Sequence, residues 1–400
     1  MKKFTAILSL ALITVVFTGA KLESSFNTGI NIEKNNSSVL PNDRTVQKEF
    51  NVKPGGKLYI NLKPGGSIKI EGWSKNVVSV RAELSGRDAD DVNVDMEQNG
   101  DEITVESYYD GGRHNYKCKE KVYVSVPEKF NVDFSTMGGD VSLNKVSGTL
   151  EGKTMGGALD LTNLNGDLDI TTMGGEINVR DCNVDGKVKT MGGQVLVENV
   201  NGDLNATSMG GKVSQRNVNG NKNSSGSAVS ISTMGGPIDV DNAPNGAKVK
   251  TMGGDIKVNS VSKFINAETY GGDIEIKKVD GSVEAKTYGG NVDVNLVGTG
   301  DNKDVEITSL GGDITVNIPS NFSMDVNVEI AYTRDWDEGE EGFQDAKIEG
   351  DFKLDESKTD KWERKHGSAR KYLRGKGSFN GGKNKVTIKT INGTVTLNKS

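Results

Sequence analysis

The sequence has few of the side chains on which metal and catalytic sites most often depend. Among its 400 residues are only two histidines, His114 and His366, and two cysteines, Cys118 and Cys182. Zinc sites of imidazole and thiolate, and catalytic triads that pass a proton through histidine, need more of these side chains than the chain offers. The spacing of the two cysteines predicts no disulfide, so we expect two unpaired thiols.

Basic charge and long apolar runs are also scarce. The chain carries 49 Lys and Arg against 55 Asp and Glu, a net charge of -6. Nucleic-acid binding needs a basic stripe that neutralises phosphates, so no nucleic-acid partner is expected. Past the N-terminus, no apolar run approaches the ~20 residues of a membrane-spanning helix, so we expect no transmembrane segment in the mature chain.

The N-terminus has the pattern of a secretory signal peptide. Lys2 and Lys3 precede an apolar run over 4–17, and small residues follow up to Ala20. This order of positive, apolar and small residues predicts cleavage after Ala20, with 1–20 as signal peptide and 21–44 as a flexible leader. An uncleaved anchor is the alternative, which the shortness of the apolar run disfavours. The expected location is exported: periplasm, cell surface or extracellular space.

Glycine, with 51 residues, is abundant and recurs at a fixed period. A Gly-Gly step returns every 18 residues, apart from one interval of 25 and one of 22. A constant period of this kind is the sequence signature of a solenoid. The steps predict a ladder of structural turns at Gly138, Gly139, Gly156, Gly157, Gly174, Gly175, Gly192, Gly193, Gly210, Gly211, Gly235, Gly236, Gly253, Gly254, Gly271, Gly272, Gly289, Gly290, Gly311 and Gly312.

Each period contains two short alternations of apolar and polar residues, separated by glycine turns. Alternation with period two indicates a strand, so one coil reads strand, turn, strand, turn. We therefore predict an all-β, single-chain β-solenoid with ~18-residue coils stacked in parallel register. The regular coils span 136–318; N-terminal coils with a small β cap occupy 45–135, and exit strands, a charged loop and a closing coil occupy 319–400.

A hydroxyl residue and then a large apolar residue precede each Gly-Gly. Counting by twos along the strand places the Thr or Ser inward, where its hydroxyl can bond to the turn backbone. The same parity would turn the next residue outward and make an exposed apolar binding stripe. The favoured alternative is that the turn breaks parity and buries these side chains. The stripe would consist of Met137, Met155, Met173, Met191, Met209, Met234, Met252, Tyr270, Tyr288 and Leu310.

Three chemistries suggested by glycine and acidic residues find little support. No helix and no Lys-Ser/Thr pair follows Gly-Gly, as a phosphate-binding loop requires. Lys212 and Pro237 interrupt the column after Gly-Gly, so a regular calcium ladder is excluded. Asp255 and Asp273 should align on neighbouring coils, yet we expect them to be solvated rather than catalytic. The row Asp239, Lys257, Glu275 and Asp293 resembles ordinary solubility patterning. No catalytic, cofactor or metal residue is predicted.

Four segments resemble the bacterial "putative adhesin" family of secreted proteins, also labelled a domain of unknown function. They are the opening FNVKPGGKLYINLKPGGSIKIEG, the TMGGDV, TMGGEI and TYGGDI steps, the NIPSNF strand and the closing KVTIKTINGTVTL. The resemblance covers roughly 45–400 and implies a β-solenoid. Relatives attached to envelope-stress regulators are also implied, but this chain shows no cytoplasmic module. The family offers no catalytic residues to transfer.

The expected function is that of a non-catalytic, exported adhesin-like or structural β-solenoid. Its partner would be a cell-surface glycan or an envelope protein. One alternative is a polysaccharide lyase or hydrolase on a β-helix, which would show several acids lining a cleft on one sheet. A second alternative is an envelope-stress sensing module. The sequence leaves the ligand, the handedness of the coil and the oligomeric state open.

Overall fold

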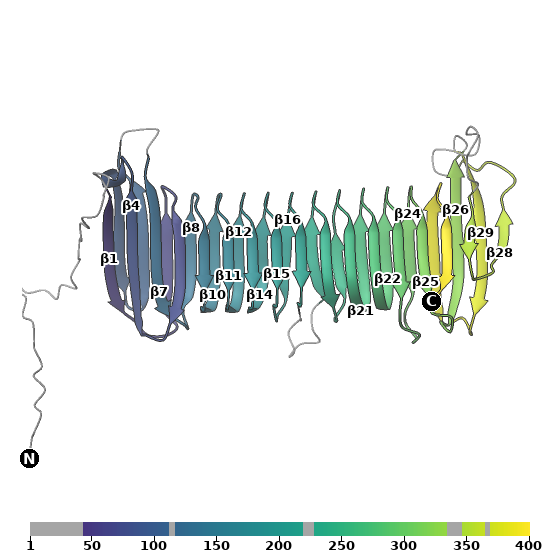
Figure 1. The fold of residues 1–400 in the computed structure, drawn as a ribbon, viewed down its shortest axis with the longest axis horizontal. Coiled ribbons are helices and arrows are strands. Elements are labelled where there is room, and N and C mark those ends of the chain that lie inside the picture. Colours follow the sequence, from purple (N-terminus) through teal and green to yellow (C-terminus); the bar gives the residue numbers. More distant parts are fainter. Residues whose placement is uncertain (1–42, 112–116, 219–227, 334–345, 365–368) are drawn as a thin grey trace, which may run out of the picture.

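The computed structural model describes residues 43–111, 117–218, 228–333, 346–364 and 369–400. These residues form one long all-β rod (Figure 1), and their one helical element is a single 3-10 turn, η1 (Ala89–Asp91). The predicted signal peptide, most of the leader, and both histidines lie outside the described residues. The described residues contain no helix long and apolar enough to span a membrane.

Two strand faces make up the flattened solenoid. The first face carries the strands that lead into each Gly-Gly step, and the second face carries the strands that follow it. The first face contains β2 (Lys57–Leu62), β6 (Glu102–Tyr109), β8 (Asn131–Thr136), β10 (Ser147–Thr154), β12 (Asn165–Thr172), β14 (Asn183–Thr190), β16 (Leu204–Ser208), β18 (Val229–Thr233), β20 (Ala247–Lys250), β24 (Val305–Ser309) and β30 (Asn384–Ile391).

The second face has the matching set of strands. It contains β3 (Ser67–Trp73), β7 (Lys119–Pro127), β9 (Val141–Asn144), β11 (Leu159–Thr162), β13 (Ile177–Arg180), β15 (Val195–Glu198), β17 (Val213–Arg216), β19 (Ile238–Ala243), β23 (Val292–Leu296), β25 (Ile314–Ile318) and β31 (Val395–Lys399). Two longer strands, β21 (Ile256–Thr269) and β22 (Ile274–Thr287), run through both faces.

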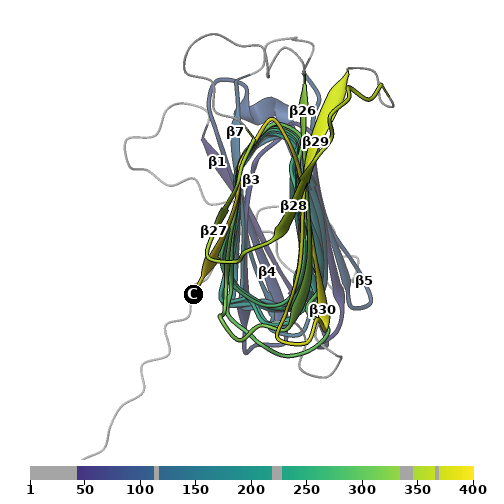
Figure 2. The same ribbon diagram turned by 90° about the vertical axis from the view of Figure 1, so that its right-hand side faces the viewer.

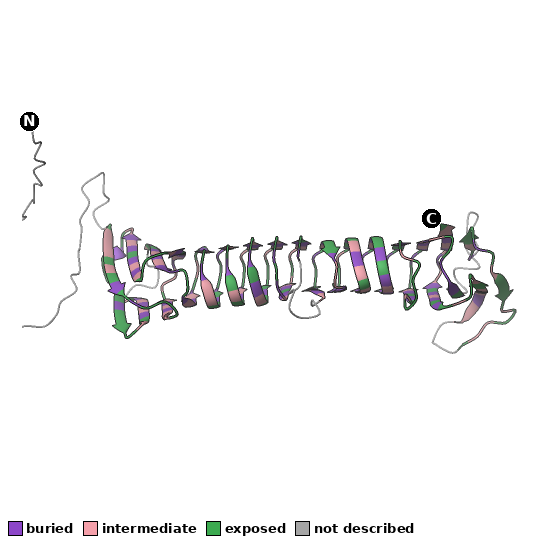
Figure 3. Ribbon diagram, turned by 90° about the horizontal axis from the view of Figure 1, so that it is seen from below, coloured by how far each residue is buried: buried purple, intermediate pink, exposed green. Residues whose placement is uncertain are grey.

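Successive coils pair in parallel with the register set by the repeat. Thr154 pairs with Thr172, and Thr172 pairs with Thr190. On the second face Leu159, Ile177 and Val195 stack inside the rod at 0–1% exposure. Figure 3 shows buried and exposed positions alternating along the strands, as a one-sided β surface requires. The predicted β-solenoid is confirmed.

Seen along the rod, the solenoid is a flattened loop with two narrow edges (Figure 2), and these edges carry different residues. One edge, the Gly-Gly edge, carries the repeated glycine step. At the other, asparagine and aspartate adopt positive φ, as at Asp181 and Asn199. Their side chains bond from coil to coil, with Asn199 Nδ2 donating to Asp181 Oδ1 at 2.9 Å. The long connection 297–304 between β23 and β24 lies at this asparagine edge.

At each end of the rod, a coil is inserted out of sequence order. The β2–β3 coil lies between the β6–β7 and β8–β9 coils. At the other end β30 pairs with both β24 and β26 (Met324–Thr333), so the C-terminal coil lies inside the end of the rod. Figure 1 shows the C-terminus accordingly short of that end.

Antiparallel strands cover both ends. At the N-terminal end β4 (Val77–Ser85) joins β1 (Arg44–Asn51) to β7, and β5 (Val92–Asn99) forms a hairpin with β6. At the C-terminal end β29 (Arg370–Phe379) lies between β26 and β28 (Asp355–Lys358), while β27 (Ile348–Gly350) pairs with β31. The outermost strand β28 is fully exposed and charged, which discourages further strand pairing.

Candidate interaction edge

A column of buried hydroxyls holds the Gly-Gly edge together. The Thr190 hydroxyl donates to the Gly175 carbonyl of the preceding coil at 2.8 Å and accepts the N–H of Gly193 at 3.1 Å. We call the column the hydroxyl ladder, and it confirms the inward placement of these residues. Its members are Thr136, Thr154, Thr172, Thr190, Ser208, Thr233, Thr251, Thr269, Thr287 and Ser309, all at most 2% exposed.

The two glycines of a step differ in how much room the neighbouring coil leaves for a side chain. A Cβ on Gly193 would lie 2.0 Å from the Gly175 carbonyl oxygen, a distance that no side chain can occupy. A Cβ on Gly192 would find its nearest neighbour at 3.7 Å, which is ordinary contact. The second glycine is therefore required for the coils to stack. At the first glycine the neighbouring coil leaves room for a Cβ.

At the N-terminal end of the hydroxyl ladder a carboxyl replaces the glycine carbonyl. Ser107 is fully buried, and its hydroxyl donates to Glu120 Oε2 at 2.8 Å. Glu120 is 4% exposed, and burial raises the pKa of its carboxyl to about 7, opposed by the hydrogen bond from Ser107 and the charge of Arg44. This buried acid was not expected from the sequence.

The large apolar residues of the edge point into solvent, so the favoured expectation that they are buried is wrong. The backbone explains the error, because the strand ladder continues one residue past the hydroxyl: Met173 N–H donates to the Thr154 carbonyl at 3.2 Å. Strand parity therefore persists at this position. Exposure is 59% at Met137, 47% at Met155, 42% at Met173, 42% at Met191, 49% at Met234, 47% at Met252, 43% at Tyr270 and 40% at Leu310, while Met209 and Tyr288 are half-buried. We call these ten residues the apolar stripe.

Within the stripe the two tyrosines stack face to face. The Tyr270 and Tyr288 ring centroids are 4.5 Å apart and their planes differ by 5°. Lys286 Nζ lies 4.8 Å from the Tyr288 centroid, and Lys250 Nζ lies 6.0 Å from that of Tyr270. At these two coils the stripe is therefore a stacked pair of rings rather than two isolated side chains.

Charges of opposite sign border the stripe on its two sides. On the first face, the position before each hydroxyl holds the exposed lysines Lys153, Lys189, Lys250 and Lys286 on four coils, Glu268 on one, and serine or threonine on the other five; we call this column the basic border. On the second face, the position after each Gly-Gly holds the exposed acids Asp140, Glu176, Asp255, Asp273 and Asp313 on five coils, Lys212 on one, and an uncharged residue on the other four; we call this column the acidic border. Sequence reasoning missed this asymmetry, although comparing the two repeat positions would have found it.

Several acids of the acidic border also have a structural role. Asp255 Oδ1 accepts the backbone N–H of Asp273 at 3.0 Å, and Asp273 Oδ1 accepts that of Asn291 at 2.7 Å. Asp313 Oδ1 in turn accepts the N–H of Thr394 at 2.7 Å. Each carboxylate thus ties its coil to the next, which accounts for the alignment of Asp255 with Asp273 without catalysis.

The outward row on the second face joins Asp239, Lys257, Glu275 and Asp293 in register, as expected. Partial burial and the neighbouring Glu275 charge raise the pKa of Asp293. Lys212 forms an ion pair with Asp239. The row therefore mixes both signs of charge, with the acids Glu275 and Asp293 adjacent.

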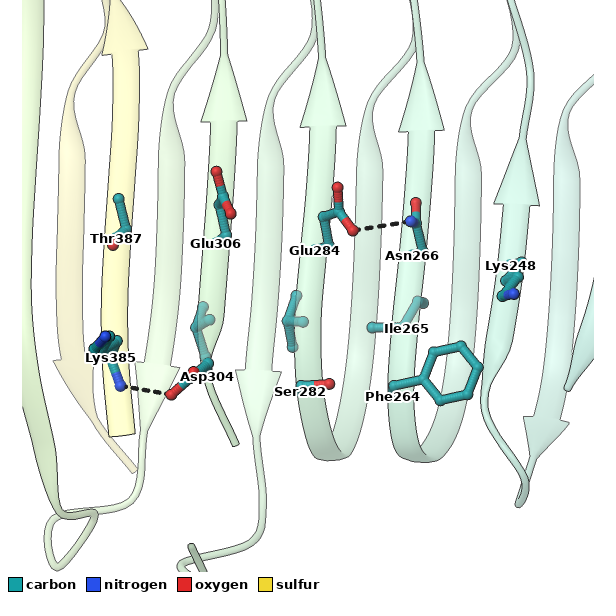
Figure 4. A pocket seen from close by; sticks show the side chains of 12 residues that line it. Lys248, Phe264, Ile265, Asn266, Ser282, Glu284, Asp304, Glu306, Lys385 and Thr387 are labelled. Atoms are coloured by element: carbon teal, nitrogen blue, oxygen red, sulfur yellow. Dashed lines mark hydrogen bonds between the residues drawn. The ribbon is translucent and has the colours of Figure 1, made fainter. Parts of the chain in front are cut away.

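A hollow on the first face is open to solvent and lined by both polar and apolar side chains (Figure 4). It has a volume of ≈ 450 Å³ and follows one register position across five strands, from Lys248 through Asn266, Glu284 and Glu306 to Thr387. Asn266 Nδ2 donates to Glu284 Oε2 at 2.9 Å. Among the described residues no group of three or more His, Cys, Asp or Glu could hold a metal.

The two cysteines are unpaired, as expected. Cys182 is buried at the asparagine edge, where its sulfur accepts the Leu164 N–H at 3.4 Å. Burial raises the pKa of both thiols, that of the buried Cys182 and that of the partly buried Cys118. Neither thiol is therefore a reactive nucleophile at neutral pH.

One family model, Toastrack DUF4097, matches the chain twice, at residues 56–230 and 222–398. The two matches overlap at 222–230 and both lie within one solenoid, so two family units share a single core. None of the curated proteins matches the chain.

Solved structures show more distant similarity. A putative cell adhesion protein from Clostridium sporogenes is 10% identical over 88% of this chain and 99% of its own, with a TM-score of 0.17. A putative adhesin from Bacteroides fragilis is 15% identical over 68% and 97%, with a TM-score of 0.26. A putative lipid binding protein from Parabacteroides distasonis is 13% identical over 69% and 92%, with a TM-score of 0.19. Likenesses of this size carry no argument about function.

Proposed function

The chain belongs to the Toastrack family DUF4097, and we propose that it is an exported, non-catalytic, adhesin-like rod that binds an envelope or extracellular partner. The apolar stripe carries this proposal. Monomeric soluble proteins rarely leave a continuous apolar surface of this length in contact with water, and such surfaces usually mark interaction sites. Because the fold is complete without burying these side chains, the stripe is available to a partner.

Two further observations support a binding role over a catalytic one. The acids that align from coil to coil along the Gly-Gly edge accept backbone N–H groups, as Asp255 does from Asp273. The hollow on the first face is lined by three acids, Glu284, Asp304 and Glu306, but it is open to solvent, Glu284 accepts a hydrogen bond from Asn266, and Asp304 accepts the backbone N–H of Lys385. Glycosidases, in contrast, place two carboxyl groups of different pKa on either side of an enclosed bond.

The test combines binding with degradation. The mature chain is incubated with purified envelope fractions and with a glycan array, and reducing sugar is measured in the same samples. We expect retention on envelope material without sugar release. Replacing Met173 and Met191 by Gln should weaken retention, while Asn205→Gln with Ser230→Gln, on two neighbouring coils of the first face, should leave it unchanged. Release of reducing sugar, or equal retention of both variants, would contradict the proposal.

A further inference from the structure

We propose that the apolar stripe docks a second copy of this chain, with the two rods side by side and pointing in the same direction. This inference rests on the proposed function in treating the stripe as an interaction surface, and it names a second copy as an occupant that competes there with an envelope or extracellular partner. Three properties of the edge carry it: its period, its area and the charges on its two borders.

The period of the stripe restricts what can contact all of it. One side chain projects per coil, and coils repeat at about 4.8 Å, the spacing of hydrogen-bonded strands. The in-register pairing from Thr154 to Thr172 to Thr190 keeps this spacing constant along the rod. A partner that packs against every member must present groups at the same interval over the same length. A second copy does so without adjustment, in the isologous contact of a twofold dimer.

The area is that of a stable dimer interface. Eight stripe residues are between 40% and 59% exposed. With roughly 200 Å² for a side chain of this size when fully exposed, they offer about 700 Å² per copy. A standard interface buries about 800 Å² per partner, and the charged borders would supply the remainder as a polar rim.

The charged borders select one of two orientations. A twofold axis parallel to the rod places the basic border of each copy opposite the acidic border of the other. Lys250 then faces the level of Asp255 and Lys189 lies one coil from Glu176, while Glu268 faces the level of the like-charged Asp273. A twofold axis perpendicular to the rod would instead oppose like borders, which costs binding energy. The charges therefore favour parallel rods.

The ends of the rod are compatible with this arrangement. At the C-terminal end β26 runs past the edge, since Ala331 pairs with Ile391 and the strand continues to Thr333. In Figure 2 the strands that rise beyond the coils, β7 and β29, lean to opposite sides of the solenoid. A twofold axis along the rod places the two copies of β29 on opposite sides of the shared edge, so they pass each other.

Sedimentation of the purified chain tests the association. We expect a dimer of the 42.8 kDa chain at micromolar concentration. Met173→Glu with Met191→Glu should raise the dissociation constant at least about tenfold, because 1.4 kcal/mol already corresponds to that factor and two charges on each copy would be desolvated. The matched control, Asn205→Glu with Ser230→Glu, adds the same charges on two neighbouring coils of the first face. A monomeric wild type, or equal dimerisation of both variants, overturns the proposal.

Oxidative cross-linking tests the orientation. In a Cys118→Ser background, Met155→Cys should form an interchain disulfide with itself, because parallel copies bring identical coils together. A disulfide formed only when Met155→Cys and Tyr288→Cys chains are mixed would show antiparallel rods and overturn the parallel arrangement. Lys189→Glu with Lys250→Glu should weaken the dimer, and adding Glu176→Lys with Asp255→Lys should restore it.

Failure of this inference is distinguishable from failure of the proposed function. A chain that sediments as a monomer, yet loses envelope retention when Met173 and Met191 are replaced, retains the proposed function without self-association. A dimeric chain whose retention on envelope material is absent retains self-association without the proposed function.

Discussion

The Thr190 hydroxyl donates to the Gly175 carbonyl in the preceding coil at 2.8 Å. The same oxygen accepts the N–H of Gly193 at 3.1 Å, so one buried atom joins two turns of the solenoid. Strand backbone also bonds from coil to coil but needs no particular side chain, whereas aspartates of the acidic border bond between coils on some coils only. The hydroxyl ladder, together with the second glycine of each step, is thus where the repeat specifies residue identity at the Gly-Gly edge.

Replacing Thr190 by Val should therefore lower stability. Valine keeps the shape and leaves the Gly175 carbonyl and the Gly193 N–H without this partner, a cost of about 1–3 kcal/mol. The thermal midpoint should fall, and amide exchange at the Gly-Gly edge should accelerate. Thr190→Ser is the control and should behave like the wild type, since the Ser208 hydroxyl donates to the Gly193 carbonyl at 2.8 Å, as Thr190 does to the Gly175 carbonyl. Equal loss in both variants would contradict the role of the hydroxyl.

Alanine substitution of one glycine pair should have unequal effects at its two positions. A Cβ on Gly193 would meet the Gly175 carbonyl oxygen at 2.0 Å, so coils would have to separate. Overpacking of this kind costs about 1–3 kcal/mol, and more where backbone cannot move. Gly192→Ala should be neutral or stabilising by up to about 1 kcal/mol, because it adds no contact closer than 3.7 Å and restricts the unfolded chain.

Urea unfolding of the two alanine variants provides the measurement. The pair serves as its own control, since the same atoms are added one residue apart. If Gly192→Ala proves as harmful as Gly193→Ala, the stacking distance is not the reason for the second glycine.

Periodic features of this chain were predictable, and single departures from them were not. The 18-residue interval and the inward hydroxyls follow from local alternation, which every coil repeats. The direction of Met173 was predicted wrongly, because strand parity and turn geometry make opposite demands there. The bond from its N–H to the Thr154 carbonyl decides between them, and no residue type encodes that bond.

The pairing of strands that are distant in the sequence was also not predicted. The segment that forms β30 and β31 was expected as the closing coil, and its alternation is indeed that of a coil. This coil lies between β24 and β26, because Val386 of β30 pairs with Val305 on one side and with Val326 on the other. Such a choice rests on the packing of many residues that are distant in sequence. The opposite charges beside the stripe, in contrast, could have been predicted, since they occupy fixed positions of the repeat.

Gln215 interrupts the apolar core, and replacing it should stabilise the rod. It is 2% exposed, and its register partners on the two adjacent coils are Val197 and Val240. Neither side-chain atom has a hydrogen-bond partner among the described residues. Burying an amide without partners costs about 1–3 kcal/mol, so Gln215→Leu, with similar volume, should recover an energy of that order.

The thermal midpoint of Gln215→Leu should rise relative to the wild type. The reciprocal variant Val240→Gln should lower it, because it would add a second amide to the same column. Ser214→Leu, at the neighbouring outward position, controls for added apolar area. A lower midpoint for Gln215→Leu would show that the amide is satisfied in solution.

Glu120 should make the stability of the N-terminal end depend on pH. Burial raises the pKa of its carboxyl to about 7, whereas the unfolded chain titrates near the usual 4.5. Between these values the folded state holds a proton that the unfolded state has released, so stability falls as pH rises through this window. The full difference amounts to about 3 kcal/mol at pH 8 relative to pH 4.

Glu120→Gln should remove this dependence, because glutamine stays neutral and its carbonyl can still accept the Ser107 hydroxyl. The variant should match the wild type at pH 4 and be more stable at pH 8, as measured by thermal unfolding at both pH values. Glu71→Gln, at an exposed position on β3, is the control and should change little at either pH. Should Glu120→Gln shift the midpoint equally at pH 4 and pH 8, the buried carboxyl would not be titrating between them, and the cost of its burial would have to be independent of charge.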